Sequence, residues 1–413
     1  MDNQYKKILC KVTILLGILV CLTGCVNTKT SSTTQVLDTT TAVESMLQND
    51  LQTNVTNSQE HLISTEDTHI IETVNDDFHV DADVVGYPID GMAGVYTAEP
   101  KDFTKEEIEA FIAHCGESIV SVKEWDDGAM QYFNGECTNG YRFGYMWGLD
   151  GVNNHPYAEF QFYDTERYMT YYDYPIYTGE ESYITNPKYT VGWMFTEPKE
   201  FSFASKEDAE TSVRDALAVL GLPNLTLLRT LYIDHNTLAK AGELLATDEN
   251  YAPIVGESEN NGYNLRDDWS EEEDAYMFSF GISTDDIPMS FIFDDSGDTA
   301  TYCGSEVNAW YTKHGITFLR VSTPWTVGER EGSSKQIVSA EAALEAAKEK
   351  YSYDLNMQDK KIEEIRLMYK YSQNRNQWLL RPVWTVRISY TVEHSDERYY
   401  SFMYIDALTG KEL

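Results

Sequence analysis

The residues of this sequence best suited to chemistry are its cysteines, histidines and carboxylates. His114 stands beside Cys115, and these residue types form a base and a nucleophile in some enzymes. The pair falls at the end of a predicted helix, where neighbours in sequence point in different directions, so we interpret both residues as structural. The sequence contains no Gly-x-Ser-x-Gly, His-Glu-x-x-His, Cys-x-x-Cys or phosphate-binding glycine-rich motif. It therefore favours a protein without catalytic residues, although a hydrolase with catalytic carboxylates would leave no such motif.

Two acidic clusters contain the oxygen ligands that Ca²⁺ prefers, at about six to eight per ion. The first comprises Asp267, Asp268, Glu271, Glu272, Glu273 and Asp274, and the second comprises Asp294, Asp295, Ser296, Gly297 and Asp298. The first has no ordered ligand spacing, and the second is typical of a hairpin turn after a strand. We interpret both as solvated acidic segments and predict neither a metal nor a cofactor.

Aromatic residues are a third group with recognisable chemistry, and the chain contains 29 tyrosines. Tyr141, Phe143, Tyr145 and Trp147 alternate along one predicted strand and therefore share a face. Tyr145 and Trp147 are our candidates for stacking against a sugar ring or holding a peptide. We favour the other interpretation, in which one face of the strand packs beneath the helix that begins after Thr104 and the tyrosines serve as strand formers.

Residues 1–24 form a predicted signal peptide. Lys6 and Lys7 give it a basic start, and its apolar stretch, residues 12–22, is shorter than the roughly 20 residues that a membrane span needs. Small residues then mark a cleavage site between Gly24 and Cys25. The sequence therefore predicts export, with the mature chain beginning at Cys25.

The quartet Leu22-Thr23-Gly24-Cys25 resembles the lipobox of bacterial lipoproteins, and the mature chain resembles large, poorly characterised lipoproteins of Gram-positive bacteria. This resemblance implies that the sulfur of Cys25 carries an acyl chain such as palmitate. Two or three acyl chains would hold a protein firmly, because each buried methylene contributes about 0.8 kcal/mol. We therefore expect a lipid-anchored protein on the extracytoplasmic side of the cell membrane.

The charge of the chain limits its partners. The formal net charge is −37, which repels phosphate backbones and anionic lipid headgroups. We expect no nucleic-acid partner, and contact with the membrane only through Cys25. Among the remaining cysteines, Cys115, Cys137 and Cys303, at least one thiol must be unpaired. A Cys115–Cys137 bridge is conceivable, but buried free thiols fit a chain of this length better.

Residues 25–77 are rich in Thr, Ser, Asn and Gln and cannot form a core, so we predict a flexible tether. Three stretches with one order of elements follow: residues 78–200, 201–330 and 331–413. Each contains a predicted helix, beginning after Thr104, Ser205 or Ser339, and several strand-like segments. The sequence therefore predicts an α+β fold of repeated units, each with one helix packed on an antiparallel sheet.

The last unit is similar to PepSY-type modules. The shared features are a helix that opens with Ser339-Ala340-Glu341-Ala342, a strand around Pro382-Val383-Trp384-Thr385-Val386, and the closing motif Tyr404-Ile405-Asp406-Ala407-Leu408-Thr409-Gly410-Lys411-Glu412-Leu413. In such modules a Thr-Gly turn reverses the chain after Asp-Ala, which suits Gly410 because glycine readily adopts positive φ. The resemblance implies an extracytoplasmic interaction module that sometimes inhibits peptidases and sometimes modulates a sensor kinase.

Two functions of different classes fit these observations. The first is a non-catalytic interaction or regulatory protein that acts through a protein partner at the cell envelope, as the lipobox, the tether and the PepSY-like unit suggest. The second is a surface lipoprotein that binds a glycan or another nutrient, as the strand with Tyr145 and Trp147 suggests.

Overall fold

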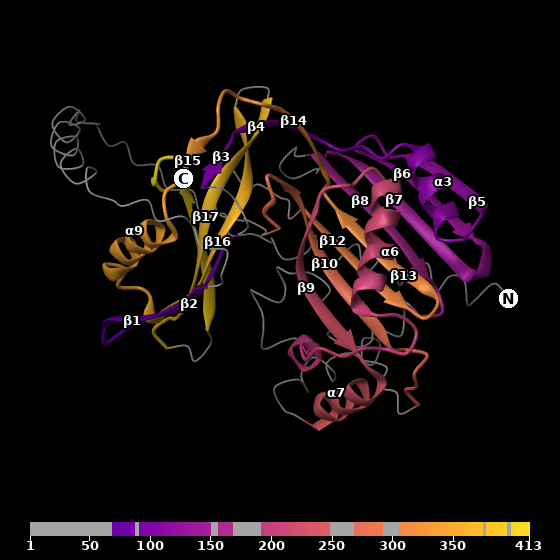
Figure 1. Ribbon diagram of the computed structural model, residues 1–413, viewed down its shortest axis with the longest axis horizontal. Coiled ribbons are helices and arrows are strands. Elements are labelled where there is room, and N and C mark those ends of the chain that lie inside the picture. Colours follow the sequence, from indigo (N-terminus) through magenta and orange to yellow (C-terminus); the bar gives the residue numbers. More distant parts are fainter. Residues whose placement is uncertain are drawn as a thin grey trace, which may run out of the picture. The chain divides into compact units, whose positions relative to one another are not determined.

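The computed structural model describes residues 68–86, 91–149, 156–167, 191–247, 268–291, 305–374, 377–394 and 398–413. All of these described residues belong to one compact unit. Two large sheets, both mainly antiparallel, dominate the described residues (Figure 1). The predicted signal peptide, Cys25 and most of the predicted tether lie outside these residues.

The predicted fold of repeated helix-on-sheet units is wrong, because the structure is mostly β-sheet and its strands pair across the predicted unit boundaries. Strand β8 (Pro156–Asp164), from the first predicted unit, pairs with β13 (Gly315–Ser322), from the second, and Tyr163 lies opposite Phe318. The alternation of apolar residues distinguishes a strand from a helix but does not identify the strand beside it. The units therefore merge into shared sheets.

Four α-helices lie in the described residues: α3 (Lys105–His114), α6 (Lys206–Val219), α7 (His235–Thr247) and α9 (Ala340–Ser352). The predicted capping box of α3 is confirmed, since the Thr104 hydroxyl accepts from the Glu107 N–H at 3.1 Å and the Glu107 carboxylate accepts from the Thr104 N–H at 2.9 Å. Ser205 and Ser339 likewise accept from backbone N–H groups of α6 and α9. These side chains pair N–H groups that a helix start otherwise leaves unpaired.

The nine-stranded sheet has the order β11-β10-β12-β13-β8-β7-β6-β5, and β9 pairs with β10. Besides β8 and β13 its strands are β5 (Ile119–Asp126), β6 (Met130–Cys137), β7 (Tyr141–Leu149), β9 (Leu225–Ile233), β10 (Ala275–Thr284), β11 (Ile287–Pro288) and β12 (Glu306–Thr312). Nearly all of β10 is buried, so both faces of the sheet must be covered there.

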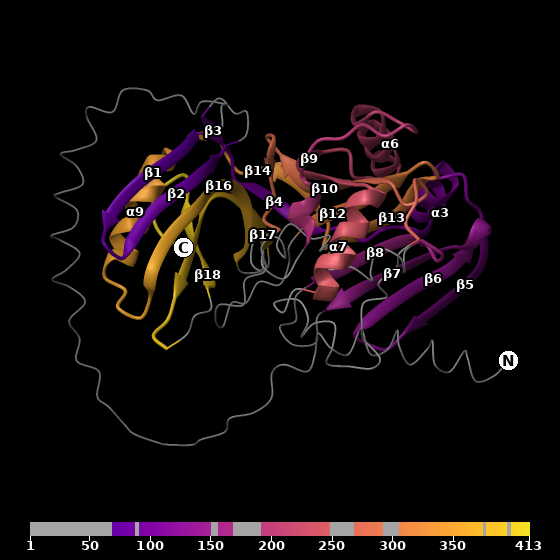
Figure 2. The same cartoon turned by 90° about the horizontal axis from the view of Figure 1, so that it is seen from below.

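Helices cover both faces of this sheet, and Figure 2 shows α6 and α7 on opposite sides of it. On one face, Phe111 of α3 lies edge-on to Phe160 and Phe162 of β8, with ring centroids 5.5 Å and 5.3 Å apart. On the other, Leu238 of α7 belongs to a cluster with Met277 of β10. The predicted aromatic side chains of β7 lie on the face of the sheet that α3 covers.

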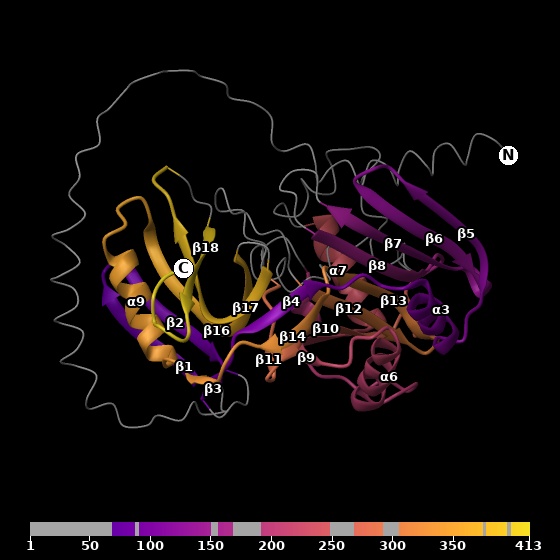
Figure 3. The same cartoon turned by 90° about the horizontal axis from the view of Figure 1, so that it is seen from above.

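The seven-stranded sheet has the order β1-β2-β16-β17-β4-β14, and β18 also pairs with β17. Its strands are β1 (Thr68–Asn75), β2 (Phe78–Val85), β4 (Tyr96–Pro100), β14 (Trp325–Arg330), β16 (Gln358–Asn374), β17 (Gln377–Thr391) and β18 (Tyr399–Asp406). Strands β3 (Met92–Ala93) and β15 (Lys335–Gln336) form a separate two-stranded sheet. Helix α9 lies against one face of the seven-stranded sheet, where the Trp384 indole donates to the Val338 carbonyl at 2.9 Å (Figure 3).

Strand β1 corrects the predicted extent of the tether, which included residues 68–75. The strand pairs antiparallel with β2, and Ile70 and Val74 pack against the core. Apart from Ile70, Ile71 and Val74 the strand is polar, which is why composition alone assigned it to the tether.

The segment that follows β10 connects the two sheets by hydrogen bonds. Met289 forms a parallel bridge with Tyr369 of β16, and the Ser290 N–H donates to the Tyr369 carbonyl at 2.7 Å. Asp285, in the turn between β10 and β11, accepts from the hydroxyls of Tyr96 at 2.6 Å and Tyr369 at 3.2 Å. The β10–β11 turn is therefore fastened to both β4 and β16.

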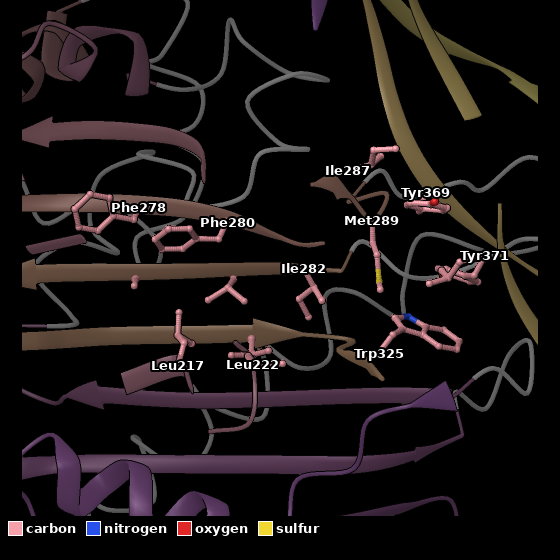
Figure 4. Packing of buried hydrophobic residues seen from close by; sticks show 14 of the residues in the cluster. Leu217, Leu222, Phe278, Phe280, Ile282, Ile287, Met289, Trp325, Tyr369 and Tyr371 are labelled. Carbon is pink, nitrogen blue, oxygen red and sulfur yellow. The ribbon is translucent and has the colours of Figure 1, made fainter. Parts of the chain in front are cut away.

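One hydrophobic core runs through this connection. Figure 4 shows Phe278 and Phe280 of β10, Ile287 and Met289 at the connection, and Tyr369 and Tyr371 of β16 as successive members of a single buried cluster. Because the apolar contacts are continuous, we expect the two sheets to unfold together.

Candidate binding pocket

Tyr145, the first of the two predicted stacking residues, is buried in the protein, with 6% of its surface exposed. Its hydroxyl donates to Asp102 at 2.6 Å and accepts from the Phe103 N–H at 3.0 Å. Burial, and then the hydrogen bond to Asp102, raises the pKa of this phenol well above its usual value. Tyr145 therefore holds the segment that leads into α3 and offers no ring face to a ligand.

Trp147, the second predicted residue, is half-buried and lines a pocket of about 170 Å³. The pocket lies where β5, β6, β7 and β8 begin or end, and its lining residues are Asp126, Gly128, Ala129, Gln131, Trp147, Gly148 and Pro156. Strand register places Gln131 of β6 directly opposite Trp147 of β7. The structure thus separates the two predicted aromatics into a core residue and a pocket residue.

The tight turn between β5 and β6 forms one wall of this pocket. The Asp126 carboxylate accepts from the Gly128 N–H at 2.6 Å, and the Asp127 carboxylate accepts from the N–H groups of Ala129 and Met130. These backbone hydrogen bonds lower the pKa of Asp127. Gly128 has a φ of +93°, which glycine adopts without strain.

Gly148 allows this turn to lie close to β7. A Cβ atom at this position would lie 2.1 Å from the Ala129 carbonyl oxygen, a distance that no side chain tolerates. Because Gly148 has no side chain, the turn can lie against β7, and the Asp126 carboxylate and the Trp147 ring line the same pocket.

The polar groups of the pocket are available to a ligand. Within the described residues, neither the Gln131 amide nor the Trp147 indole N–H has a hydrogen-bond partner, and the only hydrogen bond of the Asp126 side chain is the one to Gly128. An amide both donates and accepts, and an ionised carboxylate accepts. Sequence reasoning missed Asp126 and Gln131; the Asp-Asp-Gly turn signal at 126–128 could have indicated the hairpin that brings them to Trp147.

A second aromatic pair lies on the opposite face of the same hairpin. Trp125 stacks on Tyr132, with ring centroids 4.5 Å apart and planes 8° apart, and 46% of Trp125 is exposed. The Tyr132 hydroxyl donates to Asp127 at 3.2 Å. Trp125 therefore has an internal stacking partner, whereas Trp147 faces the pocket.

The cysteines near α3 are free thiols, and the conceivable Cys115–Cys137 bridge is absent. Burial raises the pKa of Cys115 to about 12 and that of Cys137 to about 11. Both thiols are therefore protonated and poorly nucleophilic near neutral pH. Cys303 lies outside the described residues.

The first acidic cluster forms ion pairs and hydrogen bonds with protein groups. Glu272 pairs with Lys313 and His314, and Asp274 accepts from the His235 backbone N–H at 2.8 Å. In the part of the chain that the structure describes, no group of three or more His, Cys, Asp or Glu side chains could hold a metal ion. The second cluster, residues 294–298, lies outside that part.

The remaining predicted site residues, Gly24 and Cys25, also lie outside the described residues. Among the helices that are described, none is both long and apolar enough to cross a membrane.

No protein-family model matches the chain, and no curated protein gives a significant match. Among solved structures, the chain is similar to the crystal structure of an uncharacterized protein from Eubacterium rectale ATCC 33656, with a TM-score of 0.56 and 16% sequence identity. The similarity covers 84% of this chain and 93% of that one. At this identity the similarity supports a shared fold and nothing about function.

Proposed function

We propose that this chain is a lipid-anchored extracytoplasmic binding protein that takes a saccharide unit in the pocket of Trp147, Asp126 and Gln131. The observation that carries the proposal is the combination of an indole ring with an unpaired amide and a carboxylate around one pocket. A sugar ring presents apolar C–H groups on its faces and hydroxyls on its edge. An aromatic wall suits the faces, and planar polar side chains suit the hydroxyls.

The size of the pocket and the charge of the chain limit the class of ligand. About 170 Å³ is less than the roughly 300–1,000 Å³ of sites for drug-sized molecules, so the pocket suits a single sugar unit or the end of a glycan chain. The net charge of −37 opposes polyanions. We therefore expect a neutral saccharide.

A binding role fits this pocket better than hydrolysis. Glycoside hydrolysis uses two carboxyl groups, about 5–9.5 Å apart, that flank the bond to be broken. Asp126 supplies the one carboxylate among the described residues that line the pocket. The lipobox-like quartet ending at Cys25 supports anchorage at the cell membrane, where a bound saccharide would be held near the surface.

The test compares two tryptophans of one hairpin. Neutral saccharides found on a glycan array would be titrated calorimetrically into the full-length protein and into Trp147→Ala, Gln131→Ala and Trp125→Ala variants. We expect the Trp147 and Gln131 changes to weaken binding about tenfold or more, because each removes a contact worth about 1.4 kcal/mol. Trp125→Ala is the matched control and should bind normally.

Thermal melting of each variant separates lost binding from lost fold. Normal saccharide binding by a folded Trp147→Ala variant would contradict the proposal, and so would an equal loss in Trp125→Ala.

A protein partner is the second candidate, and the exposed edge of β5 favours it. β5 ends the nine-stranded sheet, and it exposes 67% of Val120 and 43% of Val122. An open strand edge can pair with an extended segment of another protein. If this edge is the contact, Val120→Lys with Val122→Lys should abolish copurification of one envelope protein with the anchored chain, and unchanged copurification would exclude the edge.

A further inference from the structure

A gap in the seven-stranded sheet carries a second, separate site. Two strands pair with the same edge of β17: β4 pairs with Trp378 to Leu380, and β18 pairs from Val383 onward. Arg381 and Pro382 lie between them, and no strand of the described residues pairs with them on that edge. Pro382 has no N–H to leave unpaired, and its carbonyl accepts from the Ala407 N–H at 2.9 Å. The sheet therefore loses few backbone hydrogen bonds at this gap.

Arg381, at this gap, lines a pocket of about 240 Å³. Its lining residues are Ala93, Val95, Glu331, Ser333, Lys335, Arg381, Asp406, Leu408 and Thr409. Four of these side chains are charged, two positively and two negatively. None of them lines the pocket of Trp147, so the two sites are independent.

The charged groups of this pocket are only partly used by the protein. One oxygen of Asp406 accepts from the N–H groups of Leu408 and Thr409, both at 2.9 Å, and the other lies 3.7 Å from Arg381 Nη1. At 3.7 Å the guanidinium and the carboxylate attract each other without a hydrogen bond. Within the described residues, the side chains of Glu331 and Lys335 have no hydrogen-bond partner.

The cationic side is reinforced by a neighbour on the adjacent strand. Lys370 of β16 lies directly opposite Arg381 in the strand register. Its ammonium lies 3.3 Å from the centroid of the Tyr404 ring, where the aromatic face holds it close to the end of β18. Arg381 and Lys370 therefore place two cationic side chains on the same face of neighbouring strands.

We infer that this pocket binds a small zwitterion of the amino-acid type, with its carboxylate on Arg381 and Lys335 and its ammonium on Glu331. A ligand with only a negative charge would face the carboxylates of Glu331 and Asp406, and a ligand with only a positive charge would face Arg381 and Lys335. A zwitterion is attracted by both pairs. The planar guanidinium matches a carboxylate with two parallel hydrogen bonds, and charge-assisted bonds are about twice as strong as neutral ones.

The size of the pocket agrees with a small ligand. A volume of 240 Å³ lies below the roughly 300–1,000 Å³ of sites for drug-sized ligands. A free amino acid or a dipeptide, which carries both charges on a short chain, is a ligand of this size.

Calorimetric titration of the full-length chain tests this inference with four probes. Glycine carries both charges, acetate only the negative one and methylamine only the positive one, while glycylglycine separates the charges by one peptide unit. We expect glycine or glycylglycine to bind at least about tenfold more tightly than either singly charged probe. The tighter of the two zwitterions identifies a free amino acid or a peptide as the ligand class.

Two variants and a matched control assign the binding to this pocket. Glu331→Gln and Arg381→Gln should each weaken zwitterion binding about tenfold. Glu329→Gln changes an exposed carboxylate two residues from Glu331 that does not line the pocket, and it should bind normally. Thermal melting confirms that each variant is folded.

Three results would overturn the inference: no heat of binding with either zwitterion, equal affinity for acetate and glycine, or unchanged zwitterion affinity in a folded Glu331→Gln variant. Saccharide binding at Trp147 is measured with different ligands and variants, so either site can fail without the other.

Discussion

Replacement of Asp285 should reveal how strongly the β10–β11 turn is fastened to the seven-stranded sheet. Its carboxylate accepts from Tyr96 at 2.6 Å and from Tyr369 at 3.2 Å. Tyr369 has a second acceptor, the Gly94 carbonyl at 3.2 Å. Tyr96 is only 9% exposed, so water has little access to replace the carboxylate at its hydroxyl. Loss of the carboxylate should therefore affect mainly the Tyr96 hydroxyl.

The expected cost follows from these contacts. A hydrogen bond to a charged group contributes about 1.5–3 kcal/mol, and the lower end applies because Asp285 itself is exposed. We expect Asp285→Gly to lower the free energy of unfolding by about 2 kcal/mol. Asp285→Ala should cost about 1 kcal/mol more, because the φ of 51° at this position disfavours a residue with a Cβ atom.

Urea unfolding followed by tryptophan fluorescence would measure these free energies. Asp286→Gly is the matched control, since Asp286 has a similar φ of 60° but no hydrogen bond to either tyrosine. A double-mutant cycle with Tyr96→Phe should give a coupling energy of about 1–2 kcal/mol. The reasoning is refuted if Asp285→Gly is as stable as the parent chain, or if its effect and that of Tyr96→Phe simply add.

Three further predictions concern the tyrosines, the pocket and a helix start. Burial raises the pKa values of Tyr96 and Tyr276 to about 12, from 10.0, so the folded state favours the neutral phenols. The stability they contribute should be complete below pH 10 and lost as the pH rises through about 12, which alkaline titration followed by circular dichroism would detect. Gly148→Ala should destabilise the chain by about 1–3 kcal/mol and remove saccharide binding, since its Cβ atom would lie 2.1 Å from a backbone carbonyl oxygen. Gly144→Ala on the same strand meets nothing closer than 3.3 Å and serves as its control in both assays. Thr104→Ala should lower the free energy of unfolding by about 1 kcal/mol in urea, through loss of the helix cap, and an unchanged midpoint would contradict that role.

The local elements of this fold could be predicted from the sequence. Thr104 and Glu107 form the expected capping box, and the alternating residues around Tyr145 form the expected strand. These features depend on residues a few positions apart, where sequence spacing fixes spatial proximity.

Strand neighbours could not be predicted in the same way. The pairing of β8 with β13 joins residues about 160 positions apart, such as Glu159 and Ser322, and no local pattern records it. The predicted repeated units failed for this reason. A similar element order in successive stretches predicts separate sheets, although an antiparallel edge left open by one stretch can be completed by the next.

The candidate pocket was predicted only in part. Alternation correctly placed Tyr145 and Trp147 on one face of β7, but it could not show that Tyr145 is buried while Trp147 lines a pocket. Gln131 was missed because β6 lacks a strong strand signal of its own, and Asp126 because acidic turn residues are too common to stand out.

The pairing of β2 with β16 also determines when the protein can finish folding. The nine-stranded sheet and the helices on it come from residues 105–322, a continuous stretch that can assemble as soon as it is free. Strands β2 and β4 precede that stretch, yet their partners β16 and β17 are close to the last residues of the chain. Closing such distant contacts is slow, and the unpaired early strands expose open edges until it happens. The first strands therefore stay unpaired until the last strands have been synthesised. Loss of the final strands would leave the early strands without their partners.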